Sequence, residues 1–145
     1  MSKLISKYKI ITKYNLVIEY HSGTIDVDSY IKFKIKISND PLFSSTLNSF
    51  VNFEDVVFEY SAEDVTKFFV FIENNSKFEG KRQVSILTKT PNQVVPPILF
   101  KLKQKQRNSL QSLDIFSTRE SALKWLKTPS LTIKELITII NNLKK

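Results

Sequence analysis

The chain has 145 residues, of which 41% are hydrophobic and 25% are charged. A chain of this length can bury about two thirds of its surface in one folded domain. We therefore expect a single ordered domain over residues 1–145. Because there is no cysteine, disulfides, thiolate nucleophiles and zinc-thiolate sites are excluded, and we expect a cytoplasmic protein.

The positive charge is concentrated in the second half of the chain. Residues 1–80 contain 9 Lys and Arg against 11 Asp and Glu, whereas residues 81–145 contain 13 against 3. The two halves therefore carry charges of −2 and +10, which sum to the net charge of +8. Such asymmetry is found in proteins that bind nucleic acids or acidic partners. Lysines on solvated helix faces give the same pattern, and we favour this second interpretation.

The first twenty residues mix lysines with apolar residues. They contain no apolar run long enough for a signal peptide, and no run in the chain is long enough for a membrane span. Two short apolar stretches, residues 8–11 and 16–20, flank the turn-prone pair Tyr14-Asn15. This arrangement predicts an antiparallel hairpin.

Residues 26–38 contain conflicting signals. Isoleucine and phenylalanine alternate with lysine from Ile31 to Ile37, which is typical of a strand. Asp26 and Asp28, however, suit the start of a helix, and the sequence "NDP" that follows suits its end. The residues alone leave strand and helix open.

The next segment predicts a strand that leads directly into a helix. Residues 56–60 are rich in β-branched and aromatic side chains. Ser61 lies three residues before Asp64, the spacing at which a hydroxyl and a carboxylate cap a helix reciprocally. We expect this helix over residues 62–74, and a further apolar strand over residues 83–88.

The segment "TKTPNQVVPP" carries the start signals of another helix. Thr90 suits the cap position, Pro91 the first helical position and Gln93 the reciprocal position of a capping box. The segment has three prolines in seven residues, set between an apolar run and a basic run, and this also suits a binding loop. Thr90, Asn92 and Gln93 are the candidate ligand-binding residues of that loop.

Two further prolines follow in this helix. Pro96 and Pro97 lack backbone donors and disfavour helical angles in the preceding residue. We therefore expect a single turn, a kink, and then a helix from Pro97 to about Arg107. Its apolar residues Ile98, Leu99 and Leu102 should face the core. Its basic residues should face solvent as a basic patch made of Lys101, Lys103, Lys105 and Arg107.

The last part of the chain predicts a strand over residues 113–118 and two helices. Ser117 and Glu120 have capping-box spacing for the first helix, and Thr132 and Glu135 for the second. Strands and helices therefore alternate, which predicts right-handed crossovers in an α/β fold. We expect a mostly parallel sheet of about five strands with the hairpin at one edge, packed by four to five helices.

This order of elements, together with "EDVVFEYSAEDV" and "DIFSTRESALKWL", resembles the SpoIIAA-like proteins, which form the sulphate-transporter and anti-sigma-antagonist (STAS) group. The resemblance covers roughly residues 8–127. It implies a SpoIIAA-like fold and assigns residues 26–38 to a helix. It also implies a non-enzymatic bacterial module that binds and regulates a protein partner. Some relatives of the fold bind lipids, so a domain that binds a lipid or another apolar small molecule is the alternative.

In that family, a serine after the central strand is phosphorylated as a switch. Ser61 is nearest to this position, and the resemblance implies a switch or partner loop at Ser61, Glu63 and Asp64. The family's small residues after the serine are replaced here. The carboxylates of Glu63 and Asp64 would repel a phosphate on Ser61, whereas the helix N-terminus would attract it.

The last helix extends beyond the family-like region. Its apolar stripe, Ile133, Leu136, Ile137 and Ile140, needs a surface to cover it, because an isolated helix of about 12 residues is marginal in water. The stripe can fold back on its own sheet or pair with a second copy. We favour a homodimer, because the family-like region is already complete at Lys127.

Other candidate sites carry less weight. His21 and Glu19 lie on one strand face, as an acid-base pair requires, but a solitary histidine at a sheet edge is more often structural. Three pairs of carboxylates could recruit a divalent cation, but they suit helix starts and strand ends better. They are Asp26/Asp28, Glu54/Asp55 and Glu63/Asp64. Only two glycines are present, which excludes a glycine-rich phosphate loop. We therefore expect no enzyme, no metal and no cofactor.

The segment "KLKQKQR" could contact nucleic acid phosphates. It lacks interleaved aromatic residues on which bases would stack. Nucleic acid is therefore a less favoured partner than a protein.

Overall fold

The computed structural model describes residues 3–128 and 130–145. A five-stranded sheet lies at its centre, with the strands in sequence order. They are β1 (Ile5–Ile11), β2 (Leu16–Ile25), β3 (Asn48–Phe58), β4 (Arg82–Leu87) and β5 (Gln111–Phe116). β1 pairs antiparallel with β2, and the other neighbours are parallel. The predicted α/β class with an N-terminal hairpin at the sheet edge is confirmed.

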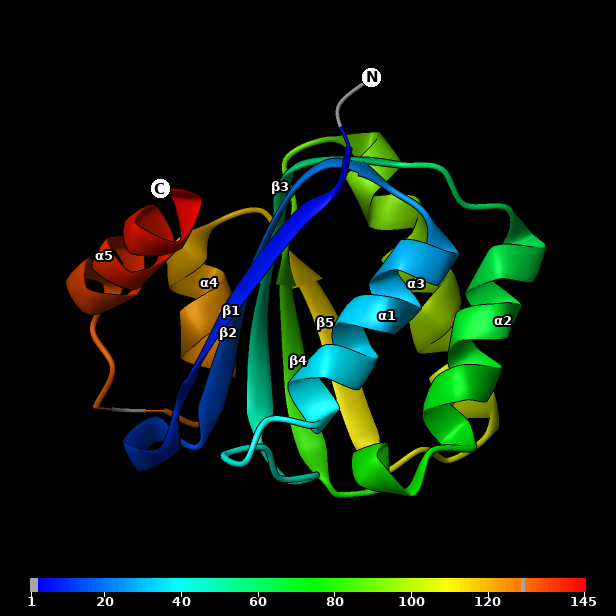
Figure 1. Cartoon of the computed structure of the whole chain (residues 1–145), viewed down its shortest axis with the longest axis horizontal. Helices are drawn as coiled ribbons and strands as arrows, with labels where there is room; N and C mark the ends of the chain where they lie inside the picture. The colour runs from blue at the N-terminus through cyan, green and yellow to red at the C-terminus, as the bar shows by residue number, and fades with distance from the viewer. Residues whose placement is uncertain (1–2, 129) are drawn as a thin grey trace.

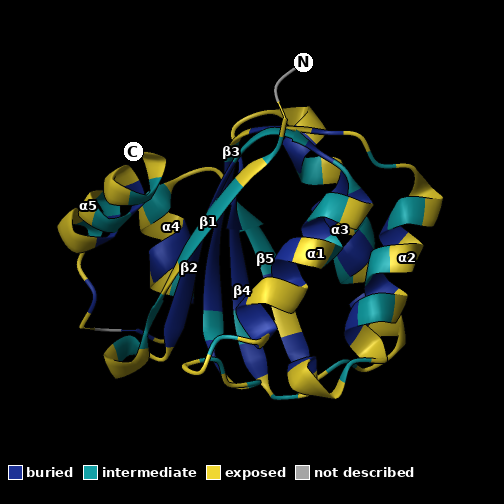
Figure 2. Cartoon of the chain, in the orientation of Figure 1, coloured by how far each residue is buried: buried dark blue, intermediate teal, exposed yellow. Residues whose placement is uncertain are grey.

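Helices cover both faces of this sheet (Figure 1). One face carries α1 (Val27–Ser38), α2 (Ala62–Glu73) and α3 (Pro91–Gln106); the other carries α4 (Arg119–Trp125) and α5 (Ile133–Lys144). Short 3-10 turns occur at Thr12–Tyr14 and Ser76–Phe78. Figure 2 shows the buried residues gathered on the strands and on the inward sides of the helices. Two apolar cores therefore flank the sheet.

The hairpin and the helix after it form as the sequence and the resemblance predicted. The turn ends at Asn15, which adopts the left-handed conformation (φ 51°) that asparagine tolerates well. Residues 26–38 lie in α1, with Asp26 accepting a bond from the Ser29 amide at 2.9 Å. On a helix, the alternating pattern brings Lys34 onto the buried face.

β3 is longer than predicted. The expected strand over residues 56–60 is only the end of an element that begins at Asn48. The first part of the strand was not predicted, because the polar residues Asn52, Glu54 and Asp55 interrupt its apolar pattern. β3 pairs with β4 only as far as Asn52, whereas its pairing with β2 continues to Phe58. The end of β3 therefore projects beyond β4.

α3 runs without interruption from Pro91 to Gln106, so the predicted helix start at Pro97 is wrong. Pro96 and Pro97 are both buried, on the side that packs against the sheet. They remove two backbone donors, but the packing of this face maintains the helix. The predicted inward face is also wrong for Ile98 and Leu102, which are 43% and 51% exposed.

The helices on the second face have clear caps. α4 is capped by the Thr118 hydroxyl, which accepts from the Ser121 amide, and not by Ser117 as predicted. α5 is capped by Thr132 as predicted, with the Glu135 amide 3.1 Å from its hydroxyl. Among the described residues, no helix is long and apolar enough to cross a membrane.

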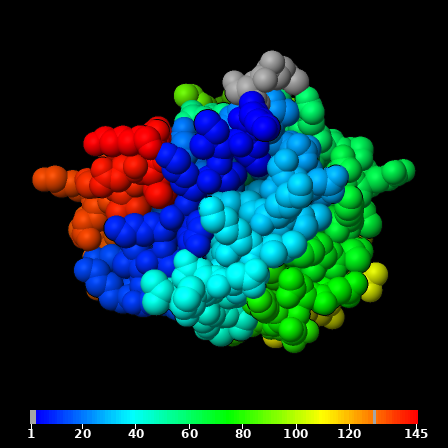
Figure 3. Space-filling view, viewed as in Figure 1, coloured from blue at the N-terminus to red at the C-terminus, as the bar shows by residue number. Residues whose placement is uncertain are grey.

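The apolar stripe of α5 is covered within the chain. Leu136 and Ile140 are fully buried in a cluster with Leu16 and Ile18 of β2. Figure 3 shows the C-terminal helix lying against the N-terminal strand, and Lys7 Nζ donates to the carbonyl of Lys145 at 2.5 Å. The uncovered stripe that argued for a homodimer is therefore not present.

Candidate functional site

The loop between β3 and α2 presents Ser61 at the protein surface. The Ser61 hydroxyl accepts from the Asp64 amide at 3.1 Å, and the Asp64 carboxylate accepts from the Ser61 amide at 2.9 Å. Ser61 and Glu63 are exposed. The predicted capping box is confirmed, and the Ser61 hydroxyl is accessible to a partner.

The start of α3 is tied to the projecting end of β3. Gln93 Nε2 donates to the carbonyls of Glu54 and Val56 at 2.9 and 3.0 Å, and Asn92 Oδ1 accepts from the Phe58 amide at 3.0 Å. Gln93 Oε1 accepts from the amide of Thr90 at 3.1 Å. These side chains satisfy backbone groups of β3 that β4 does not reach. A ligand bound at the predicted loop would have to displace these bonds.

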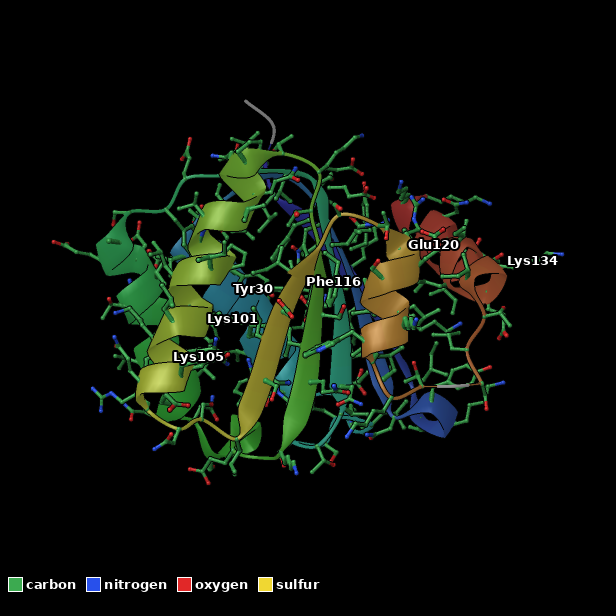
Figure 4. The ribbon with its side chains drawn as sticks, turned by 180° about the vertical axis from the view of Figure 1, so that it is seen from behind. Tyr30, Lys101, Lys105, Phe116, Glu120 and Lys134 are labelled. Atoms are coloured by element: carbon green, nitrogen blue, oxygen red, sulfur yellow. The ribbon has the colours of Figure 1, made fainter. Side chains whose placement is uncertain are left out.

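The basic residues of α3 do not form one patch. Lys101 pairs with Asp114 of β5 at 2.9 Å, and Lys105 lies along the same side of the helix (Figure 4). Lys103 and Arg107 instead border a surface depression against α2. The four basic residues therefore lie on two sides of α3. A phosphate chain could contact only some of them at once, which weakens the case for nucleic acid binding.

The outer face of α3 is apolar. Val95, Ile98 and Leu102 are 55%, 43% and 51% exposed. Their spacing places them on one side of the helix, opposite the buried residues Pro96 and Phe100. We call these three residues the α3 stripe. Sequence reasoning missed the stripe because the two prolines were expected to break the helix, which obscured its periodicity.

Carboxylates of the paired acidic residues contact other side chains of the protein. Asp28 pairs with Lys67 at 2.6 Å, and Glu54 lies 3.6 Å from Arg119. Asp55 accepts a bond from the Tyr20 hydroxyl at 2.5 Å. Within residues 3–128 and 130–145, no three histidine or acidic side chains gather as metal ligands would.

Beneath α1, a buried polar network centres on Glu19. Its carboxylate accepts from Lys34 Nζ at 2.8 Å, from the Tyr30 hydroxyl at 3.0 Å and from His21 Nε2 at 2.8 Å. Glu19 and His21 are fully buried, and Lys34 nearly so. In the sequence, Lys34 stood out only as one of the lysines that alternate with apolar residues. Its position four residues after Tyr30 and one after Phe33 was a signal that it shares their face.

The same network contains a serine-histidine-carboxylate series. The Ser6 hydroxyl lies 2.7 Å from His21 Nδ1, on the opposite side of the ring from Glu19. A hydrolytic site needs such an order of groups, but it also needs room for a substrate. His21 is enclosed by the rings of Tyr30, Phe33 and Phe53. It lies on the interior strand β2 and not at a sheet edge as predicted, and the surrounding rings favour a structural role.

Charges within this network are strongly coupled. Burial raises the pKa of Glu19, but the neighbouring Lys34 and His21 more than offset this and lower it to about 2. Burial lowers the pKa of His21 below its usual 6.5, despite the attraction of Glu19. Burial likewise lowers the pKa of Lys34. At neutral pH, the network thus contains an ionised Glu19 and a neutral His21.

The fold is shared with known proteins, although no protein-family model and no curated protein sequence matches the chain. An anti-sigma factor antagonist from Mycobacterium paratuberculosis is similar in structure, with a TM-score of 0.54 and 14% identity over 86% of this chain and 95% of that one. An uncharacterised protein with a SpoIIAA-like fold from Shewanella loihica aligns with a TM-score of 0.47 and 12% identity, over 87% and 98%. The chain has a SpoIIAA-like fold. The expectation drawn from the sequence resemblance is thereby confirmed at the level of the fold.

Proposed function

We propose that this chain is a non-enzymatic regulatory module that binds a protein partner through the outer surface of α3 and the start of α2. The observation that carries the proposal is the α3 stripe. The likeness in fold to an anti-sigma factor antagonist, whose name describes a protein that acts on another protein, supports it.

The three residues of the α3 stripe lie outside both apolar cores. An amphipathic helix turns its apolar residues toward the core, and α3 already does so with Pro96 and Phe100. The stripe is a second apolar face of the same helix, and it leaves apolar side chains exposed to solvent. Grouped apolar side chains on a surface are typical of protein interfaces, where they form the dry centre.

The surroundings of the stripe define the chemistry of the partner. Lys105 is exposed along one side of α3, and Lys101 on the same side pairs with Asp114. A fitting partner has an apolar site bordered by carboxylates, because complementary charge speeds association and disfavours wrong partners. An acidic protein surface meets this description. A nucleic acid does not, because its phosphate chain offers no apolar centre.

Ser61 lies within reach of the same surface. β3 and β4 are parallel, so the helices that follow them, α2 and α3, begin at the same edge of the sheet. We place Ser61, Glu63 and Asp64 at the border of the partner surface. A phosphate on Ser61 would add negative charge beside Glu63 and Asp64, and it would weaken contact with an acidic partner.

Site-specific photocrosslinking tests the proposal. A photoreactive amino acid at Ile98 should form an adduct with one discrete protein in cells of the native host. The same group at Lys134, which lies on α5 on the other side of the molecule (Figure 4), is the matched control. The Ile98 adduct should disappear when Leu102 is replaced by Asp. Equal adducts from both positions, or none from Ile98, would refute the proposed surface.

A further inference from the structure

The core between the sheet and helices α1–α3 contains a cavity of about 60 Å³. Its wall is largely apolar and includes the rings of Phe53, Phe68 and Phe100. One water molecule needs about 10–15 Å³ of such space. The cavity therefore has room for the body of a small organic molecule. It lies on the inward side of α3, opposite the α3 stripe, and is separate from the proposed partner surface.

One polar side chain of the cavity wall is incompletely bonded. Arg82 of β4 is only 4% exposed. Its Nε and Nη2 both donate to Gln111 Oε1, at 3.0 and 2.8 Å. Its Nη1 is buried and has no acceptor in the part of the chain that the structure describes. Buried donors are nearly always bonded, so this nitrogen marks a place for an acceptor from outside the chain.

The charges around the cavity do not balance. Glu19 attracts both Lys34 and Arg82, but it is bonded to Lys34 at 2.8 Å. The bonded partner of Arg82, Gln111, is neutral, so two buried cations share one carboxylate. Burial lowers the pKa of Arg82 to about 10, which still leaves the guanidinium charged at neutral pH. The ring of Phe78, centred 5.3 Å from the guanidinium carbon, compensates this charge only in part. One carboxylate for two buried cations leaves a positive charge uncompensated, which is unfavourable, so the site favours an anion.

We propose that this cavity binds a short-chain carboxylate. The carboxylate accepts from Arg82 Nη1 and balances the guanidinium charge, while the hydrocarbon chain lies against Phe53, Phe68 and Phe100. A carboxylate fits better than a phosphate, because the apolar wall offers few donors for the remaining phosphate oxygens. The volume limits the ligand to a few carbon atoms.

Nuclear magnetic resonance titration of the ¹⁵N-labelled full chain tests the proposal. The probes are straight-chain carboxylates from acetate to octanoate, with 1-butanol and inorganic phosphate as controls. Butyrate should shift amide signals of β4, β5 and the inward side of α3. Affinity should rise about fourfold for each buried methylene until the cavity is full. 1-Butanol, which lacks the charge, should bind at least ~10-fold more weakly than butyrate.

Substitutions identify the anchoring group. Arg82→Met should remove the preference for butyrate over 1-butanol, whereas Lys124→Met, which removes an exposed cation of α4, should leave it unchanged. Thermal melting checks that Arg82→Met is folded; if it is not, the titration of the unmodified chain alone decides. Equal binding of acetate and butyrate, or of butyrate and 1-butanol, would refute the proposal. So would the absence of binding, or shifts confined to surface lysines.

Discussion

The cores on the two faces of the sheet differ in the side chains that fill them. The core under α1, α2 and α3 is rich in aromatic rings and encloses Glu19, His21, Lys34 and Arg82 together with the cavity. The core under α4 and α5 is mainly aliphatic. Aliphatic packing stabilises a fold without demanding partners for polar groups, whereas each buried ionised group does demand one. We therefore expect the α4–α5 face to contribute mainly packing stability, and the α1–α3 face to hold the groups that respond to pH and ligands.

Removing the centre of the buried network should have the largest effect. Glu19→Ala leaves Lys34 without its counter-charge, and breaking a buried ion pair in this way typically costs about 3–5 kcal/mol. Urea denaturation measures the loss of unfolding free energy. Glu120→Ala, at an exposed site in the first turn of α4, is the control and should change stability little. A loss below about 1 kcal/mol for Glu19→Ala would mean that the network is not coupled as described.

On the aliphatic face, Leu136→Ala should destabilise the chain by about 2–5 kcal/mol, because it removes a fully buried side chain and leaves a cavity. Thr138→Ala, two residues later at an exposed position, should have little effect. Denaturation and sedimentation should be measured together. Unchanged stability combined with a change from dimer to monomer would show that α5 serves association and not the core of one chain.

Acid should act most strongly on the buried network of the α1–α3 face. The pKa values of His21 and Glu19 are lower in the folded chain than their usual 6.5 and 4.5. The unfolded chain therefore binds more protons, first below about pH 6.5 at His21 and then below about pH 4.5 at Glu19. Stability should fall as the pH drops through these ranges. Glu19→Gln should flatten the lower range in denaturation curves recorded between pH 7 and 2; an unchanged slope there would contradict the role of Glu19.

The smallest expected change in stability concerns the cap of α2. Ser61→Ala removes an N-cap bond and should cost about 0.5–2 kcal/mol, read from thermal melting. Ser61→Asn and Ser61→Asp both retain a capping oxygen and should melt near the unmodified chain.

These two variants differ in charge and so separate the cap from the switch. If a negative charge at Ser61 controls partner binding, Ser61→Asp should lose the photocrosslinked partner, while Ser61→Asn retains it. Loss in both variants, or in neither, would speak against a charge switch at Ser61.

The sequence predicted local features well where they depend on residues close together in the chain. The caps at Ser61 and Thr132 form as predicted, because each depends on residues only three positions apart. The helix over residues 26–38 required the family resemblance, because its alternating pattern resembles a strand. The continuous α3 was missed, because its two prolines are tolerated only through packing against the sheet.

The buried charges could not be predicted in the same way. Glu19 and Lys34 meet only when α1 folds across β2, and Arg82 meets Gln111 only when β4 pairs with β5. Such contacts join residues 15 and 29 positions apart, and no local spacing encodes them. The sequence singled out Ser61 and Glu63, which lie at the surface, but it did not indicate the α3 stripe or the cavity.

Hydrogen exchange of the chain, alone and with the partner captured through Ile98, tests the central claim most directly. Partner binding at the outer face of α3 and the start of α2 should slow exchange in these two helices. Amides of α4 and α5 should exchange at the same rate with and without the partner. Protection confined to α4 and α5, with α3 unchanged, would contradict the account.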